Sequence, residues 1–479
     1  MIEGYVPKDQ RKKVLLLSDD IRFFSGIATM AREMVIGTCH KYNWVNLGGA
    51  GIHPDHGKVF DISQATSQLV DVPDPSIFVF AINGYGDRET VMRLIKDQKP
   101  DILLLITDPR YWIHIFKAEH EIRKKIPIVY LNIWDDTPAP LYNKPYYESC
   151  DALMAISKQT YNINKIVLGE KAKDKIIEYV PHGINTKLFF PIDQSNIDLN
   201  NKLQIFKERV TEGKSYDFIF LYNARNIRRK SVSDLILAYK LFCDEVGKEK
   251  SDKCLLLLHT DAVDENGTDL PAVIEYINTD GANIKILEQK FSPEEMNLLY
   301  NFSDVTCLVS SNEGWGLSLT ESMMVGKMII ATVTGGMQDQ MRFEDENGKW
   351  LDFDINLPSN HFGTYKKHGE WAVPIYPNNI SLIGSPLTPY IYDDRADFRD
   401  IKKALLEVYN LTPEERDRRG MLGRQWVLSD ESMMTANKMC DNVLKTLDKL
   451  VSTWKPRSEY EFIKFEKLKS KKSPHKLIY

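Results

Sequence analysis

The sequence predicts an α/β protein with two doubly wound domains, each a parallel β-sheet covered by helices on both faces. Short apolar runs alternate with longer amphipathic segments, which is typical of strands and helices that alternate along the chain. The apolar runs form two series separated by a polar stretch. At 479 residues the chain also exceeds the roughly 250–300 residues at which a single core usually stops growing. We therefore expect two domains facing a cleft.

The first series of strand candidates lies in the first half of the chain. Each is a short run rich in aliphatic residues, as expected for strands that are buried on both faces. The runs cover residues 14–18, 45–47, 102–106, 128–132 and 152–155. They predict a Rossmann-like N-terminal domain over residues 1–190.

The second series predicts a Rossmann-like C-terminal domain over residues 216–440. Its strand candidates are residues 218–223, 255–259, 284–287, 305–309 and 328–331. The polar, Asn- and Lys-rich stretch 191–215 lacks strand character and is interpreted as an interdomain linker with a short helix. Ligands of open α/β sheets bind beyond the carboxyl ends of the strands. We therefore expect the functional site in the cleft between the domains.

The remaining segments are an insertion and a C-terminal extension. Residues 343–400 are rich in Pro, Gly, Asn and aromatic residues and are predicted to be irregular, although the aromatic content favours order. Helical patterns resume over residues 400–410 and 414–429. Residues 441–479 are predicted to form a helix and a basic tail that pack back on the N-terminal domain. The tail is either a solvated extension or a contact for a polyanion.

Composition excludes several classes of protein. Hydrophobic residues make up 43% and charged residues 27%, as in ordinary globular proteins, and the formal charge of −5 gives no support for general polyanion binding. The six cysteines are scattered and are interpreted as buried thiols in a reducing compartment. There is no apolar signal core and no apolar run near the ~18 residues of a membrane span. These features predict a cytoplasmic protein without an integral membrane segment.

Two glutamates around a Gly-x-Gly turn form the most informative motif of the chain. Glu313 precedes the turn, and Glu321 follows it near the start of a predicted helix. Because glycine has no Cβ, Gly314 and Gly316 would let the backbone approach a ligand closely. The start of the helix would offer amide groups and a positive dipole end to a phosphate. Alone, such a pair of glutamates could equally be a solvated helix face.

A basic loop follows the first predicted strand of the second domain. Arg225 and Lys230 lie at the carboxyl end of strand 218–223 and before a predicted helix. A guanidinium and an ammonium at this position can converge on one diphosphate. Arg228 and Arg229 lie in the same loop and are weaker candidates for the same contact. A basic loop by itself is usually only solvated.

Together, these motifs resemble retaining glycosyltransferases with the GT-B fold, particularly glycosyltransferase family 4, the group 1 glycosyltransferases. The glutamate pair matches the family's carboxylate pair, and Arg225 and Lys230 match its basic pair, although Ser231 stands where the family usually has Gly. Residues 181–191, from Pro-His-Gly-Ile-Asn to Phe-Phe-Pro, resemble the family's interdomain junction. There Gly183 is expected to adopt a positive φ. The resemblance covers nearly all of residues 12–450 and is strongest over residues 217–341.

The resemblance implies transfer of a sugar from a nucleoside diphosphate, with UDP as the first expectation, to an acceptor hydroxyl with retained configuration. It implies that the N-terminal domain faces the acceptor and that no metal or other cofactor is required. Arg225, Lys230 and Glu313 are the expected catalytic residues, with Glu313 on the sugar and Glu321 on the ribose. The expected donor-binding residues are these four together with Gly26, Gly314, Trp315, Gly316 and Leu317.

Other matches to the family concern the sugar and the acceptor. Ser25 and Gly26 follow the first strand, as in the family's glycine loop. Asp135 lies where many relatives have a His-Asp pair, but Trp134 replaces the His, so a turn role for Asp135 is an equal alternative. Gly336, in a Gly-Gly pair, resembles the loop beside the sugar. The run Asp352-Phe353-Asp354 has the spacing of a metal-binding pair but is interpreted as accidental.

Three alternatives follow from the same sequence. A dinucleotide-dependent oxidoreductase would need a Gly-x-Gly-x-x-Gly fingerprint after a strand, with an acidic residue about 20 positions later, and none is present. A non-catalytic nucleotide-sugar-binding protein on the same scaffold is disfavoured by the presence of both basic and both acidic residues. The acceptor is left open between a glycan, a lipid-linked and a small-molecule acceptor. The insertion and the basic tail suggest a further alternative, a bacteriophage-type enzyme that glycosylates hydroxymethylated DNA bases.

Overall fold

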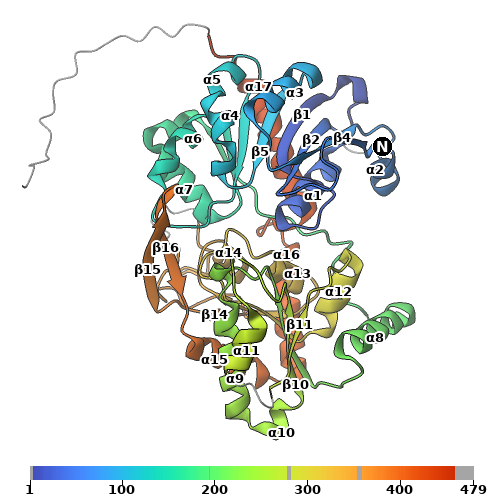
Figure 1. Cartoon of the computed structure of the whole chain (residues 1–479), viewed down its shortest axis with the longest axis vertical. Coiled ribbons are helices and arrows are strands. Elements are labelled where there is room, and N and C mark those ends of the chain that lie inside the picture. Colours follow the sequence, from blue (N-terminus) through green and yellow to red (C-terminus); the bar gives the residue numbers. More distant parts are fainter. Residues whose placement is uncertain (1–3, 194, 278–281, 353–358, 459–479) are drawn as a thin grey trace, which may run out of the picture.

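The computed structural model describes residues 4–193, 195–277, 282–352 and 359–458. The chain forms two lobes, one above the other in Figure 1, and each contains a largely parallel sheet flanked by helices. The predicted α/β fold class is confirmed. Part of the basic tail, residues 459–479, lies outside the described residues, as do Phe353 and Asp354 of the Asp-x-Asp run.

The N-terminal lobe contains an eight-stranded sheet in the order β3-β4-β2-β1-β5-β6-β7-β8. Neighbouring strands are parallel except β3, which runs antiparallel to β4 at the edge. The bounds are β1 Lys12–Asp19, β2 Tyr42–Ala50, β3 Val59–Asp61, β4 Ile77–Asn83, β5 Ile102–Ile106, β6 Ile128–Asn132, β7 Ala152–Ala155 and β8 Ile176–Tyr179.

Helices cover both faces of this sheet. In β1, Val14 and Leu16 pack on the side of α1 and α17, whereas Leu15 and Leu17 pack on the side of α3 and α7. This alternation explains why β1 reads as an unbroken apolar run. The helices of this part of the chain are α1 Gly26–Thr38, α2 Ser63–Val70, α3 Arg88–Gln98, α4 Ile113–Lys117, α5 Glu119–Ile122, α6 Lys144–Glu148 and α7 Lys158–Leu168, with 3-10 turns at Lys8–Gln10, Pro109–Trp112, Leu141–Asn143 and Gly169–Asp174.

The C-terminal lobe contains a six-stranded parallel sheet in the order β11-β10-β9-β12-β13-β14. Its strands are β9 Phe218–Asn223, β10 Cys254–His259, β11 Ile284–Leu287, β12 Val305–Leu308, β13 Met328–Thr332 and β14 Ala372–Ile375. The helices are α8 Ile197–Thr211, α9 Val232–Val246, α10 Lys248–Ser251, α11 Leu270–Ile277, α12 Pro293–Phe302, α13 Leu317–Met324, α14 Met337–Met341, α15 Phe398–Tyr409, α16 Pro413–Leu428 and α17 Ala436–Thr453, with a 3-10 turn, η5, at Arg228–Lys230. Although α17 is the last helix of the described chain, it packs against α1 of the first lobe.

All of the predicted strands are present, and β5, β6, β7, β9 and β11 have the predicted bounds. The prediction omitted β3, β4, β8 and β14. β3 is a three-residue edge strand, and β8 is an edge strand whose residues are mostly half-buried, so neither carries a strong apolar signal. β4 is different, because it is as apolar as the strands that were predicted.

The insertion 343–400 is more regular than predicted. Its strand β14 extends the parallel sheet beyond β13, and β15 (Asn379–Ser385) and β16 (Thr388–Arg395) form an antiparallel hairpin. The hairpin reaches from the lower lobe to the region of α6 and α7 in the upper lobe (Figure 1). There the Tyr392 amide donates to the Thr137 carbonyl (2.6 Å), and the Tyr142 hydroxyl donates to the Tyr390 carbonyl (3.1 Å). The hairpin therefore links the two lobes.

The stretch 191–215 contains a longer helix than the short one that the sequence predicts. α8 spans 15 residues and packs against α12 of the second lobe. Its Phe206 ring lies 5.2 Å from the Phe291 ring and 5.8 Å from the Phe302 ring, measured between centroids. Few other residues of α8 are buried, which explains its weak sequence signal.

The expectation of a positive φ at Gly183 is wrong, because this residue is not among the glycines in the left-handed region. Glycine is needed for another reason. A Cβ at this position would lie 2.7 Å from Ala436 Cα and 2.7 Å from the Thr435 carbonyl oxygen. The junction therefore passes directly against the start of α17, which returns to the first lobe.

We expect Gly183→Ala to destabilise the protein by about 1–3 kcal/mol, because the clashing atoms are backbone and cannot rotate away. Thermal denaturation would show the loss as a lower midpoint. Thr186→Ala, in the same loop, is the control and should leave the midpoint nearly unchanged. Equal midpoints for wild type and Gly183→Ala would contradict the packing described here.

Candidate active site

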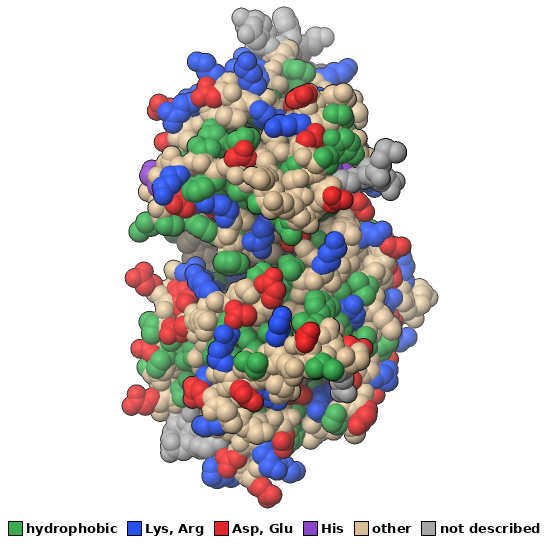
Figure 2. Space-filling view, turned by 90° about the vertical axis from the view of Figure 1, so that its right-hand side faces the viewer, with side chains coloured by type: hydrophobic (Ala, Val, Ile, Leu, Met, Phe, Trp, Pro, Cys, Tyr) green, Lys and Arg blue, Asp and Glu red, His purple; other side chains and the backbone are tan. Residues whose placement is uncertain are grey.

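The carboxyl ends of the strands in the two lobes face each other across the waist of the molecule. Figure 2 shows a hollow at this waist, between the two lobes. Between the lobes, the loops after β9 and β12 of the lower lobe meet the loop after β6 of the upper lobe. These loops carry the predicted residues Lys230, Glu313 and Asp135. This arrangement follows the general position of ligand sites in open α/β sheets.

Lys230 and Glu313 form the centre of a charged cluster at the waist. The Lys230 ammonium forms an ion pair with Glu313 Oε2, and both side chains are about nine-tenths buried. Arg229 Nη1 lies 3.2 Å from the same oxygen and 3.6 Å from Asp135 Oδ2 of the upper lobe. The Ser310 hydroxyl also donates to Glu313 Oε2 (3.3 Å). The structure thus unites two predicted residues of the lower lobe with one of the upper lobe, and it adds Arg229.

The charged side chains of this cluster shift one another's pKa values. Burial raises the pKa of Glu313, but Lys230 and Arg229 outweigh it, so the pKa lies below its ordinary value and the carboxylate stays ionised. Burial lowers the pKa of Lys230, which Glu313 only partly opposes. For Arg229 burial also lowers the pKa, but Glu313 and Asp135 reverse the direction. The pKa of Asp135 is raised by its burial.

Asn312 connects this cluster to the hairpin. Its side-chain amide donates to the Asp136 carboxylate of the upper lobe and to the Tyr392 carbonyl of β16 (2.6 Å). The following strand residues also hold the loop before Glu313, since the Asp394 amide donates to the Ser311 carbonyl (3.2 Å). The hairpin therefore fixes the position of the Glu313 loop relative to the Asp135 loop.

The glycines near Glu313 lie against protein rather than against open space. A Cβ on Gly314 would lie 2.7 Å from the Ile133 carbonyl oxygen of the upper lobe, and one on Gly316 would lie 2.9 Å from the Leu319 side chain. A Cβ on Gly336 would lie 2.0 Å from the Gly314 carbonyl oxygen. The Gly336 amide donates to the Glu313 carbonyl (2.8 Å). The sequence predicts that these glycines let the backbone come close to a ligand. In this structure, the atoms closest to Gly314 and Gly336 belong to other loops of the protein.

The start of α13 is also engaged by protein. The Gly316 amide donates to Gln340 Oε1 (3.2 Å), and the Leu317 amide donates to the Trp315 carbonyl (3.1 Å). The Trp315 indole is buried and donates to the Thr320 hydroxyl (3.1 Å), so it does not reach the cleft. Trp315 could therefore contact a sugar donor only through its backbone. The Leu317 side chain is half-buried.

Glu321 lies one turn into α13 in a buried network. Its carboxylate accepts a hydrogen bond from the Tyr300 hydroxyl (2.5 Å), which in turn accepts one from the Asn223 amide at the end of β9 (2.6 Å). Asn223 Oδ1 lies 2.8 Å from His259 Nδ1 at the end of β10. Burial raises the pKa of Glu321 to about 7. The sequence did not indicate Tyr300, Asn223 or His259.

This pKa predicts a stability that depends on pH. Because the pKa of Glu321 rises from 4.5 unfolded to about 7 folded, folding favours the protonated carboxyl. The resulting stability is complete below pH 4.5 and is lost as the pH rises through about 7, a difference of about 3 kcal/mol. In the ligand-free protein we expect Glu321→Gln to flatten the fall in thermal midpoint between pH 5 and pH 8.

Asp339, whose pKa burial raises to about 6, acts in the same direction, so the flattening should be partial. Glu265→Gln, on an exposed carboxylate, should leave the pH profile as in wild type. If Glu321→Gln and wild type lose stability in parallel above pH 6, Glu321 is not buried as described.

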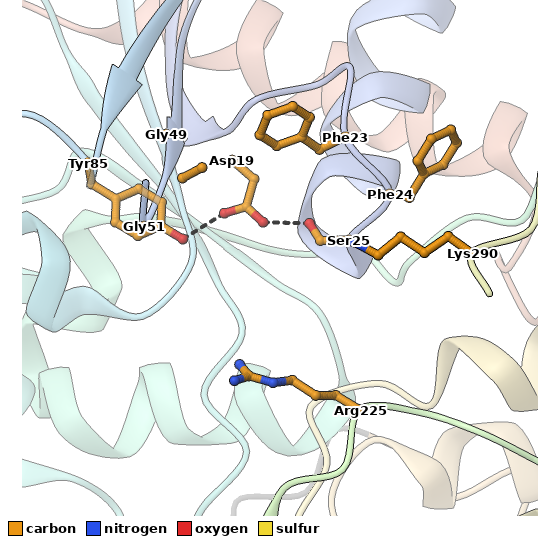
Figure 3. Close-up of a pocket in the computed structure, with 10 residues that line it drawn as sticks. Asp19, Phe23, Phe24, Ser25, Gly49, Gly51, Tyr85, Arg225 and Lys290 are labelled. Carbon is orange, nitrogen blue, oxygen red and sulfur yellow. Dashed lines mark hydrogen bonds between the residues drawn. The ribbon is translucent and has the colours of Figure 1, made fainter. Parts of the chain in front are cut away.

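Arg225 lies at a cavity of about 590 Å³ between the lobes and apart from the Lys230 cluster. Its guanidinium pairs with Asp264, with Nε 2.7 Å from Oδ2. Lys290 of the lower lobe also lines the cavity and extends toward Ser25 in Figure 3, and the upper lobe contributes Asp19, Phe23, Phe24, Ser25 and Tyr85 together with the stretch 49–51 at the end of β2. Figure 3 shows Arg225 across the cavity from Asp19.

Ser25 and Gly26 lie where this cavity meets the start of α1. The Ser25 hydroxyl caps the helix by accepting from the Ala28 amide (3.0 Å), and a Cβ on Gly26 would meet no atom within 4 Å. The motifs of the sequence did not indicate Asp19, Tyr85 or Lys290. Asp19 could have been found by its place at the carboxyl end of the central strand β1. Tyr85 and Lys290 carry no such signal.

Two further features of the structure concern a metal site and a membrane span. Within the described ranges, no group of three or more His, Cys, Asp or Glu side chains is arranged to hold a metal ion. In the same part of the chain, no helix combines the length and the apolar character that a bilayer span requires.

Residues 204–355 match the family Glycosyl transferases group 1. This stretch includes the Arg225 loop, the Lys230–Glu313 pair and Glu321. The chain therefore carries a group 1 glycosyltransferase domain in its second lobe. No curated protein sequence matches the chain.

Solved glycosyltransferase structures share the fold over at least 91% of the chain. Sucrose-phosphate synthase from Thermosynechococcus elongatus has 14% identity and a TM-score of 0.64, covering 92% of this chain and 100% of that one. An α,α-trehalose-phosphate synthase (UDP-forming) from Burkholderia vietnamiensis has 8% identity and a TM-score of 0.62, covering 92% and 98%. HepE from Anabaena in complex with UDP-glucose has 12% identity and a TM-score of 0.58, covering 91% and 100%. At these identities the likeness establishes the GT-B fold.

Proposed function

We propose that this glycosyltransferase, whose residues 204–355 form a group 1 domain, transfers a sugar from a UDP-sugar to an acceptor hydroxyl with retained configuration. The observation that carries the proposal is the cluster of Arg229, Lys230 and Glu313 inside that domain, at the carboxyl ends of β9 and β12. UDP is favoured because HepE was solved with UDP-glucose and the trehalose-phosphate synthase is described as UDP-forming.

The chemistry assigned to the site is stabilisation of a departing diphosphate. Lys230 and Arg229 would face the negative charge that grows on the leaving oxygen, and Arg225 would approach it from the cavity. Glu313 would hold hydroxyls of the transferred sugar, and Glu321 those of the ribose. As the bond from the anomeric carbon of the sugar to the diphosphate breaks, the acceptor oxygen forms the new bond to that carbon on the same face, and an oxygen of the leaving phosphate takes the proton of the acceptor hydroxyl. Contact between the lobes would exclude water and limit hydrolysis.

The proposal is tested by incubating the protein with a panel of UDP-sugars without acceptor. We expect slow release of UDP from one or a few of them, and an increase in thermal midpoint when UDP is added. Release of no UDP from any sugar of the panel, together with an unchanged midpoint, would rule out the proposed donor.

A further inference from the structure

We infer that Asp19 binds the acceptor and that the acceptor is a neutral, polyhydroxylated ring, that is, a saccharide without a charged group. This inference rests on the proposed function, since it concerns the acceptor side of the same cleft. The inference is drawn from the cavity in Figure 3, which places the Asp19 carboxylate of the upper lobe across from Arg225 of the lower lobe.

Asp19 is held by two hydroxyl groups and not by a cation. The Tyr85 hydroxyl donates to Oδ1 (2.6 Å) and the Ser25 hydroxyl to Oδ2 (2.5 Å). Both donors are themselves fixed, because Ser25 caps α1 and the Tyr85 ring packs against Tyr111 and Trp112 with centroids 4.5 and 5.2 Å away. In the described chain no Lys or Arg forms an ion pair with Asp19. An ionised carboxylate accepts about four hydrogen bonds, so Asp19 keeps capacity for hydroxyls of a ligand.

The neighbouring Asp20 shows what a structural carboxylate looks like in this lobe. It is fully buried and is bound by Arg22 (2.7 Å) and His53 (2.9 Å). Asp19 follows the opposite pattern, since it is only partly buried, lines a cavity and lacks a cationic partner. A carboxylate with free acceptor capacity at a cavity wall is suited to bind hydroxyl groups.

The rest of the cavity wall suits the apolar face of a sugar ring. Phe24 is 65% exposed at the rim. Phe23 is stacked on His53, with centroids 4.8 Å apart, which covers one of its faces. Gly51 also lines the cavity, and a Cβ at this position would meet no atom within 4 Å, so the wall is open at Gly51. Aromatic faces beside a carboxylate can contact the C–H groups and the hydroxyls of one saccharide at the same time.

Charge argues against an anionic acceptor on this wall. Asp19 would repel a phosphate placed against it, whereas Arg225 lies across the cavity, where the donor diphosphate is expected. A saccharide hydroxyl bound to Asp19 would lie between this carboxylate and the donor. The same reasoning disfavours hydroxymethylated DNA, whose backbone carries a phosphate at every nucleotide.

The experiment measures transfer from the best UDP-sugar to three groups of acceptors: neutral mono- and disaccharides, the corresponding sugar phosphates, and duplex DNA with hydroxymethylated cytosine. We expect transfer to neutral saccharides. Asp19→Asn should lower kcat/KM for the acceptor by about 10- to 100-fold, because a hydrogen bond to a charged group is lost, with little change in the KM for the donor. Tyr85→Phe, which removes one donor to Asp19, should have a smaller effect in the same direction.

Asp71→Asn is the matched control, because Asp71 is exposed at the left-handed end of α2 (φ 55°), a conformation that Asn tolerates. Transfer only to sugar phosphates or DNA, no transfer to any neutral saccharide, or an unchanged kcat/KM for the acceptor in Asp19→Asn would each overturn the inference. UDP release in water tests the proposed function separately. A wild-type protein that releases UDP but fails these tests would refute only the acceptor assignment.

Discussion

Lys230→Ala is expected to lower turnover by about 100- to 1000-fold, the loss typical when one donor that stabilises a developing negative charge is removed. The Lys230 ammonium is buried and bound to Glu313, so no water can easily replace it. We expect the affinity for UDP to fall as well, because the diphosphate loses a cationic partner. Single-turnover kinetics with the best UDP-sugar and a titration with UDP would measure both effects.

Arg228→Ala is the matched control for this prediction. Arg228 lies in the same 3-10 turn, but its side chain is exposed and forms no ion pair within the described part of the chain. It should keep nearly wild-type turnover, whereas Arg229→Ala should approach the loss seen for Lys230→Ala. Equal losses in Arg228→Ala and Lys230→Ala would mean that the loop acts through its overall charge and not through the contacts described here.

Glu313→Gln should separate turnover from affinity. We expect kcat to fall by about 10- to 100-fold, because an amide binds the sugar hydroxyls more weakly than a carboxylate. The affinity for UDP should rise instead, since the negative charge beside Lys230 and Arg229 is removed. The free variant should be less stable than wild type by about 1–3 kcal/mol, because two cations lose their counter-charge.

The increase in thermal midpoint on adding UDP measures the expected gain in UDP affinity separately from the loss of kcat. We expect a larger shift in Glu313→Gln than in wild type, because the diphosphate replaces the missing counter-charge. Glu265→Gln, at an exposed position of the same lobe, should shift like wild type. A smaller shift in Glu313→Gln would indicate that Glu313 itself contacts the nucleotide.

The fold could be predicted where the sequence signal is local. Strands such as β5 and β6 are buried on both faces and therefore appear as continuous aliphatic runs. β14 could not be predicted in this way. Its run Ala372-Val373-Pro374-Ile375 contains a proline, which is tolerated because β14 is an edge strand, and that position is known only once the sheet is assembled. The hairpin β15–β16 escaped prediction because most of its residues are exposed or only half-buried.

The candidate site could be predicted only in part. Lys230, Glu313 and Glu321 stand in recognisable motifs, but the sequence cannot tell which of Arg228 and Arg229 faces the cleft, because that depends on the 3-10 turn. The sequence suggested that the glycines make room for a ligand. The contacts at Gly314 and Gly336 come from loops that are distant in the sequence, so the sequence could not show them. Asp19 belongs to no motif, and only the assembled cleft places it beside Tyr85 and opposite Arg225.

The most direct test is a crystal structure of the protein with a bound UDP-sugar. We predict the diphosphate at the waist within hydrogen-bonding distance of Lys230 and at least one of Arg225 and Arg229, with the sugar against Glu313. UDP found outside the cleft, or inside it without contact to these basic side chains, would contradict the proposed donor site.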